Sequence, residues 1–118
     1  TRLRTVTGVQ TCALPISSTE LKEKIKNGDK IIVDFWATWC GPCKVMKPMF
    51  ESASKELMEQ NSEVQLYTFN IEKDMDLVSE MGIRSVPTIK GFSDGRALFS
   101  EVGVKNTSLI MEMTKKLL

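Results

Sequence analysis

Two cysteines in this sequence have a spacing that supports either metal binding or redox chemistry. Cys40 and Cys43 enclose a Gly-Pro dipeptide, and the third cysteine, Cys12, is distant in the sequence. A Cys-x-x-Cys pair can be half of a zinc site, a pair of inert thiols or a redox-active dithiol. Because the chain has no histidine and only one further cysteine, we expect no metal and no other cofactor.

The position of the pair favours redox chemistry. It directly follows a short β-prone run, 31–36, and begins a helical pattern that extends to about Gln60. Unpaired amides at a helix start carry partial positive charge and stabilise a thiolate. Cys40, at the cap, should therefore have a pKa below roughly 8.5 and attack, whereas Cys43, one turn on and less exposed, should resolve. Gly41 allows close backbone approach, and Pro42 fits the first helical turn.

The elements that must hold this pair predict an α/β fold. Ser17 and Glu20 form a capping box for a first helix, and Asp74 caps a short helix that Gly82 ends. Strand patterns cover 31–36, 64–71, 88–92 and 97–102, and the last two flank a hairpin signal at 93–96. A final helix, 106–118, is expected to turn four residues inward: Leu109, Ile110, Met113 and Leu117. This order predicts one mixed central sheet with helices on both faces.

The first sixteen residues read differently from the rest. They show neither alternation nor helical period, and Val6 to Ile16 resembles the translation of a sequencing-library adapter. We therefore divide the chain into a non-native, adapter-derived segment, 1–16, and a domain, 17–118. The alternative is a natural but irregular N-terminal strand. On the adapter interpretation Cys12 has no evolved role and the native N-terminus is lost.

Composition excludes several classes of function. Sixteen basic and fifteen acidic residues give a net charge of +1 with no long run of one sign, so no nucleic-acid partner is expected. No apolar stretch approaches the ~20 residues that span a bilayer, so no membrane partner is expected either. We expect a cytoplasmic monomer.

Three segments in order resemble the thioredoxin family, and the resemblance covers 17–118. Residues 33–44 read Val-Asp-Phe-Trp-Ala-Thr-Trp-Cys-Gly-Pro-Cys-Lys and are similar to the family's active-site segment. Residues 82–88, Gly-Ile-Arg-Ser-Val-Pro-Thr, are similar to its cis-proline loop, and Val102-Gly103 resembles a glycine bend beside the active site. The resemblance implies the thioredoxin fold, with the family's first strand missing or replaced.

The resemblance also implies roles that spacing alone does not give. Cys40 would attack a substrate disulfide and Cys43 would resolve the mixed disulfide. Asp34 would be a buried carboxylate of raised pKa that exchanges a proton with Cys43. The alternative for Asp34 is a strand-end carboxylate paired to a lysine such as Lys44. Thr68 stands where the family often has a lysine near this aspartate.

The substrate-contact surface is implied in the same way. Pro87 would be a cis residue across from the cysteines that exposes the Val86 backbone to an extended substrate segment. Trp36 is assigned to packing. Lys90-Gly91 interrupts what should be an apolar strand. The implied contact residues are Trp39, Gly41, Pro42, Val86, Pro87 and Gly103.

These observations predict a thiol–disulfide oxidoreductase, a protein-disulfide reductase. The resemblance implies disulfide-containing protein substrates, a thioredoxin reductase as electron donor, and a role in electron transport and cell redox homeostasis. Gly-Pro between the cysteines resembles the reducing members, because oxidases and isomerases often carry histidine before the second cysteine. The alternatives are an exported or membrane-tethered reductant and a binding or chaperone-like subunit of the same fold.

Overall fold

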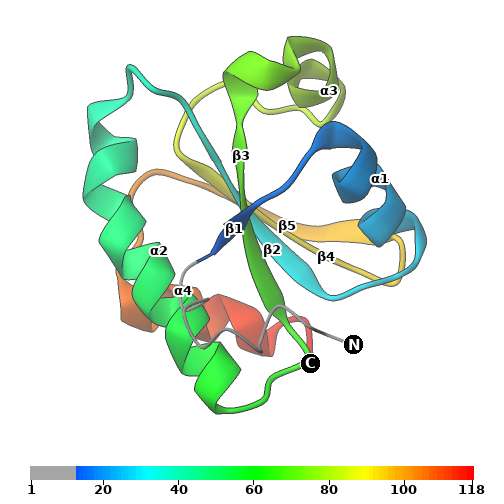
Figure 1. Ribbon diagram of the computed structural model, residues 1–118, viewed down its shortest axis with the longest axis vertical. Helices are drawn as coiled ribbons and strands as arrows, with labels where there is room; N and C mark the ends of the chain where they lie inside the picture. Colours follow the sequence, from blue (N-terminus) through cyan, green and yellow to red (C-terminus); the bar gives the residue numbers. More distant parts are fainter. Residues whose placement is uncertain (1–12) are drawn as a thin grey trace.

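The chain folds around one mixed five-stranded sheet. The computed structural model describes residues 13–118, and its strand order is β1-β3-β2-β4-β5. Strands β1, β3 and β2 run parallel, whereas β4 and β5 are antiparallel to their neighbours. Helices cover both faces of the sheet (Figure 1). The predicted sheet type and layering are confirmed.

The elements follow the predicted order, with one short strand and one 3-10 turn added. The strands are β1 (Leu14–Pro15), β2 (Ile31–Trp36), β3 (Gln65–Asn70), β4 (Thr88–Ser93) and β5 (Arg96–Val102). The helices are α1 (Ser18–Lys26), α2 (Gly41–Glu59), α3 (Met75–Glu80) and α4 (Thr107–Lys115), with the 3-10 turn η2 (Ile71–Lys73). No helix of residues 13–118 combines the length and apolar character needed to cross a membrane.

The predicted caps are present. Ser17 Oγ accepts the Glu20 N–H at 3.1 Å, and the Glu20 carboxylate accepts the Ser17 N–H at 3.2 Å. Asp74 Oδ1 accepts the Leu77 N–H at 3.0 Å, so it starts α3 as expected. Each cap satisfies a backbone donor that has no partner within its helix.

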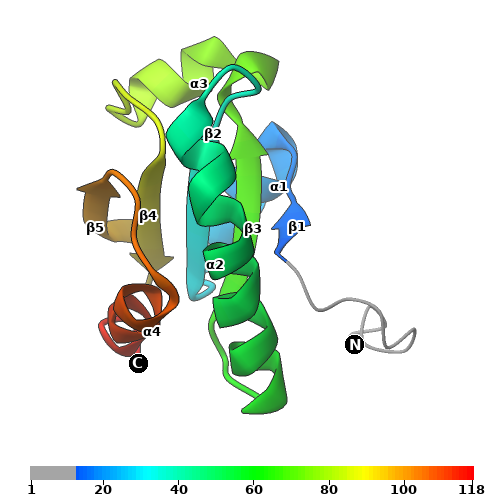
Figure 2. The ribbon, with the colours of Figure 1, turned by 90° about the vertical axis from the view of Figure 1, so that its left-hand side faces the viewer.

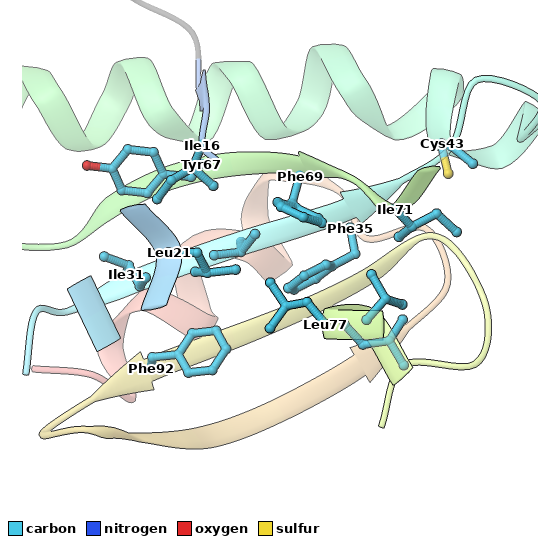
Figure 3. Packing of buried hydrophobic residues seen from close by; sticks show 14 of the residues in the cluster. Ile16, Leu21, Ile31, Phe35, Cys43, Tyr67, Phe69, Ile71, Leu77 and Phe92 are labelled. Carbon is cyan, nitrogen blue, oxygen red and sulfur yellow. The ribbon is translucent and has the colours of Figure 1, made fainter. Parts of the chain in front are cut away.

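The core lies in two layers separated by the sheet. Helices α1 and α3 pack on one face, and α2 and α4 pack on the other (Figures 1 and 2). Because strand side chains alternate, Val33 and Phe35 join the first layer while Ile32 joins the second. Figure 3 shows the first layer extending from Tyr67 and Ile31 at one end to Ile71 and Cys43 at the other.

The prediction that Leu109 lies in the core is wrong. The Leu109 side chain in α4 is 49% exposed, whereas Ile110 is fully buried. The buried residues of α4, Ile110, Met113 and Thr114, cover an arc of about 100° around the helix axis. Leu109 lies about 40° beyond the edge of this arc at Met113, so it faces solvent.

Lys90 and Gly91 lie inside a continuous β4 rather than interrupting it. A Cβ atom on Gly91 would clash with the ring of Phe99, its partner on β5. Glycine therefore makes room for a cross-strand aromatic side chain. Lys90 Nζ donates to the Met81 carbonyl at 3.0 Å, where α3 ends, and its burial lowers the Lys90 pKa.

A short first strand occupies the edge at which a strand was expected to be missing or replaced. Leu14 and Pro15 pair with Tyr67 and Thr68 of β3, and the Ile16 N–H donates to the Thr68 carbonyl at 3.0 Å. Ala13 is 8% exposed and Ile16 is 7% exposed. These residues belong to the predicted adapter-derived segment. The rest of that segment, including Cys12, lies outside the described residues, and its origin stays a prediction.

We predict that Ile16→Ala lowers the free energy of unfolding by about 2–4 kcal/mol, because it removes buried apolar atoms and leaves a cavity beside β3. Leu118→Ala is the control, since Leu118 is 71% exposed. Urea denaturation of both variants measures the difference. Equal small losses would show that residues 13–16 do not support the domain.

Candidate active site

The two cysteines lie at the junction between β2 and α2. Cys40 is the N-cap of α2, and its Sγ accepts the Cys43 N–H at 3.1 Å. The two side chains form a disulfide whose Cα atoms are 5.3 Å apart. Pro42 lies in the first turn, where no amide is needed. Each cysteine is 3% exposed, so the expected lower exposure of Cys43 is not found in this oxidised form.

A tight turn leads from β2 to the disulfide. The Cys40 N–H donates to the Ala37 carbonyl at 3.2 Å, which closes a four-residue turn with Thr38 and Trp39 at its centre. Trp39 is 68% exposed, and its contact with substrates stays a prediction. The Thr38 N–H and hydroxyl both donate hydrogen bonds to the Glu72 carboxylate of η2. Glu72 was not among the predicted site residues, although it immediately follows the predicted strand 64–71.

Asp34 is a buried carboxylic acid in the middle of the sheet. It is 3% exposed and pairs in register with Thr68 of β3 and Ile89 of β4. Thr68 thus neighbours Asp34 where the family often has a lysine. Strand alternation places Asp34 on the same face as Ile32, which is the α2 face. Burial raises the Asp34 pKa from 3.8 to about 7.

The predicted alternative for Asp34, an ion pair with a lysine such as Lys44, is absent from residues 13–118. Within that range Asp34 Oδ1 also has no hydrogen-bond partner. A protonated carboxyl group tolerates this environment far better than a carboxylate, because an isolated buried charge is costly. The site therefore contains an acid whose ionisation is balanced near neutral pH.

The proline loop and the glycine bend reach the same end of the sheet as the disulfide. Thr88 pairs with Phe35 on one side and with Val102 on the other. Pro87 and Gly103 are the next residues beyond these pairs. The Val86–Pro87 peptide bond is cis, and the Gly103 N–H donates to the Pro87 carbonyl at 2.9 Å. Gly103 has a φ of +99°, which favours glycine.

The predicted contact residues differ in exposure. Trp39, Gly41 and Pro42 are exposed, and Val86 and Gly103 are half-buried. The Pro87 side chain is fully buried, so any contribution it makes to contact passes through its backbone and its neighbours. Trp36 is half-buried against the first core layer, which agrees with its assignment to packing. No group of three or more potential metal ligands occurs among residues 13–118.

Comparison with known proteins agrees with this geometry. The family description "Thioredoxin" matches residues 13–116. This chain belongs to the thioredoxin family. A thioredoxin from Rickettsia felis is 36% identical over 95 residues, covering 80% of this chain and 88% of the relative.

Solved thioredoxin structures are similar along most of the chain. The crystal structure of Malassezia sympodialis thioredoxin has a TM-score of 0.79 at 28% identity and covers 92% of each chain. The oxidised form of mitochondrial thioredoxin 3 from Saccharomyces cerevisiae has a TM-score of 0.72 at 28% identity and covers 89% of this chain and 95% of the other. This thioredoxin is a thiol–disulfide oxidoreductase that acts by dithiol–disulfide exchange.

The burial of Asp34 predicts how the free energy of unfolding depends on pH. In the folded chain the Asp34 carboxyl group keeps its proton up to about pH 7, whereas in the unfolded chain it ionises near pH 3.8. The free energy of unfolding should therefore fall as the pH rises from about 4 to about 7, and level off above that range. Asp34→Asn removes this loss and should be more stable than the natural chain by about 4 kcal/mol at pH 8.

Urea denaturation between pH 4 and pH 8 measures this difference. Asp29→Asn is the matched control, because Asp29 is an exposed aspartate just before the same strand. The control profile should run parallel to that of the natural chain. A parallel profile for Asp34→Asn would contradict a carboxyl group buried in its protonated form.

Proposed function

We propose that this thioredoxin reduces disulfides in protein substrates and is returned to its dithiol form by a thioredoxin reductase. The observation that carries the proposal is the Cys40–Cys43 disulfide at the N-terminus of α2, with Cys40 at the cap. When the disulfide is reduced, the unpaired amides of the first turn stabilise negative charge on Cys40. Cys40 then attacks as a thiolate at neutral pH.

The exchange transfers two electrons to the substrate in two steps. The Cys40 thiolate attacks one substrate sulfur, forming a mixed disulfide and releasing the other substrate sulfur as a thiolate that takes a proton. Cys43 then loses its proton and attacks Cys40 Sγ. The intramolecular disulfide forms, the mixed disulfide breaks, and the second substrate sulfur leaves and is protonated. The reductase supplies two electrons and two protons for the next cycle.

Asp34 accepts the proton of Cys43 in the second step. An acid of pKa about 7 holds and releases protons in the range in which the exchange operates. Asp34 lies on the sheet face that α2 covers, and it has no competing ion pair within residues 13–118. Both groups are buried, so we assign the transfer between them to a bridging water molecule rather than to bulk solvent.

The substrate binds across the end of the sheet at which the three loops meet. Trp39, Gly41 and Pro42 offer exposed apolar and backbone surface beside Cys40. Val86, which precedes the cis Pro87, offers its backbone groups to an extended substrate segment, and Gly103 adds contact surface beside it.

We further propose a monomer in the cytoplasm, where it contributes to electron transport and cell redox homeostasis without nucleic-acid or membrane partners. The β5 edge supports a monomer. Gly91 pairs with Phe99 while Phe92 pairs with Ala97, so Leu98 is an extra residue that makes this edge irregular. Irregular edges disfavour strand pairing between copies. A reducing compartment keeps a dithiol of this kind reduced and able to act as a donor.

We predict that the chain catalyses dithiothreitol-driven reduction of insulin and that Cys40→Ser abolishes this activity, because the attacking sulfur is lost. Cys43→Ser should form the mixed disulfide but fail to resolve it, which mass spectrometry of the trapped complex measures. Cys12→Ser makes the same chemical change and should leave activity unchanged. Activity that persists in Cys40→Ser would refute the dithiol mechanism.

A second prediction concerns the proton acceptor. Asp34→Asn should slow release of the reduced substrate from the mixed disulfide by about a hundredfold at pH 7, because Cys43 then loses its proton without a base. Formation of the mixed disulfide should change much less. Single-turnover stopped-flow kinetics separates the two steps, with Asp29→Asn as control. Unchanged release would remove Asp34 from the mechanism.

A further inference from the structure

The turn that carries Trp39 to the disulfide is hydrogen-bonded to a side chain of another element, Glu72 of η2. Its first and last residues, Ala37 and Cys40, are buried, but both central residues, Thr38 and Trp39, are exposed. The Thr38 N–H donates to Glu72 Oε1 at 3.0 Å. The Thr38 hydroxyl also donates to Glu72, at 2.9 Å to Oε1 and 3.2 Å to Oε2.

This contact extends the pairing of β2 with β3 beyond the ends of both strands. Trp36 and Asn70 are the last pair in that parallel ladder, and Thr38 and Glu72 each lie two residues further on. Glu72 is itself fixed, because its N–H donates to Asn70 Oδ1 at 2.9 Å. Figure 2 shows the β2–α2 turn at the top of the molecule, beside the segment that joins β3 to α3.

The carboxylate is suited to this contact by its charge. The Thr38 backbone bond is the largest of the effects that lower the Glu72 pKa, so Glu72 is ionised at neutral pH. Hydrogen bonds to an ionised acceptor are roughly twice as strong as those between neutral groups. Without Glu72, the Thr38 donors would bond to water and the exposed turn would adopt several conformations.

We propose that Glu72 is a positioning residue for substrate binding, holding the Thr38–Trp39 turn in the conformation that presents Trp39 beside Cys40. The inference rests on the proposed function, in which Trp39 contacts the substrate. A protein substrate that must select one conformation of a mobile turn binds with an affinity reduced by the population of that conformation. A small disulfide that reaches Cys40 without contacting Trp39 has no such requirement.

The test compares Glu72→Ala with Glu59→Ala, which removes an exposed glutamate at the far end of α2. In insulin reduction, Glu72→Ala should raise KM roughly tenfold with little change in kcat, and Glu59→Ala should change neither. Glu72→Gln, which keeps one acceptor oxygen, should restore part of the loss. The rate of reduction of a small aromatic disulfide should stay within about twofold of the natural chain in all variants. An unchanged KM in Glu72→Ala, or an equal loss on the small disulfide, would overturn the proposal.

Two further measurements do not require activity towards a protein. Amide hydrogen exchange by NMR should show protection at Thr38 falling about tenfold in Glu72→Ala, while β2 amides stay protected. In a double-mutant cycle on KM, Thr38→Val combined with Glu72→Ala should be no worse than Glu72→Ala alone, because the two side chains act through one contact. If the natural chain fails to reduce insulin, the proposed function fails, and unchanged Thr38 exchange would then separately refute the role of Glu72.

Discussion

The hydrogen bond from the Cys43 N–H to Cys40 Sγ is the contact on which the site depends. It makes the sulfur of Cys40 the N-cap of α2, so the reacting atom lies where the helix offers unpaired donors. A sulfur can occupy that place only if β2 ends at Trp36 and a tight turn follows, which Ala37 and Cys40 close with their own bond. The end of β2, the length of the turn and the start of α2 must therefore all match for Cys40 to be the N-cap.

The same site keeps an acid in the core at a cost to stability. Asp34 is the one acidic or basic side chain among the buried residues of the described range. Its neighbours in the sheet are Thr68 and Ile89, neither of which carries a charge. A lysine in place of Thr68 would stabilise the carboxylate and lower its pKa. With threonine at position 68, burial is the dominant influence on the Asp34 pKa, so the proton stays on Asp34 up to about pH 7.

Local signals in the sequence predicted most of the fold, because each depends on residues close together in the chain. The Ser17–Glu20 capping box, the Asp74 cap and the hairpin at Asp94-Gly95 all involve neighbours within a few positions. The prediction for Leu109 was wrong because helical period alone does not say how wide a face the neighbouring helix covers. Gly91 was misjudged for a similar reason, since the Phe99 ring that requires it comes from another strand.

The reacting cysteines of the site could be predicted from the sequence, but the residues that assist and position them were harder to predict. Cys40 and Cys43 could be found from spacing and from the strand before them. Asp34 and Pro87 required the family resemblance, because neither the burial of a carboxylate nor the isomer of a proline bond follows from local sequence. Glu72 was missed altogether. Its contact with Thr38 follows from the register of β2 against β3, and register between distant strands is not visible in either segment alone.

Strand direction explains why loops so far apart in the sequence meet at one place. Strand β2 ends at the disulfide, so a neighbouring strand can bring its first residues there only by running in the opposite direction. Strand β4 does so, and Pro87 immediately precedes it. Strand β5 reverses again and therefore delivers Gly103 to the same end, where its N–H bonds to the Pro87 carbonyl. A fully parallel sheet would place the start of β4 at the opposite end from Cys40. The antiparallel hairpin is thus what makes a two-sided substrate site possible around a disulfide built on a parallel strand.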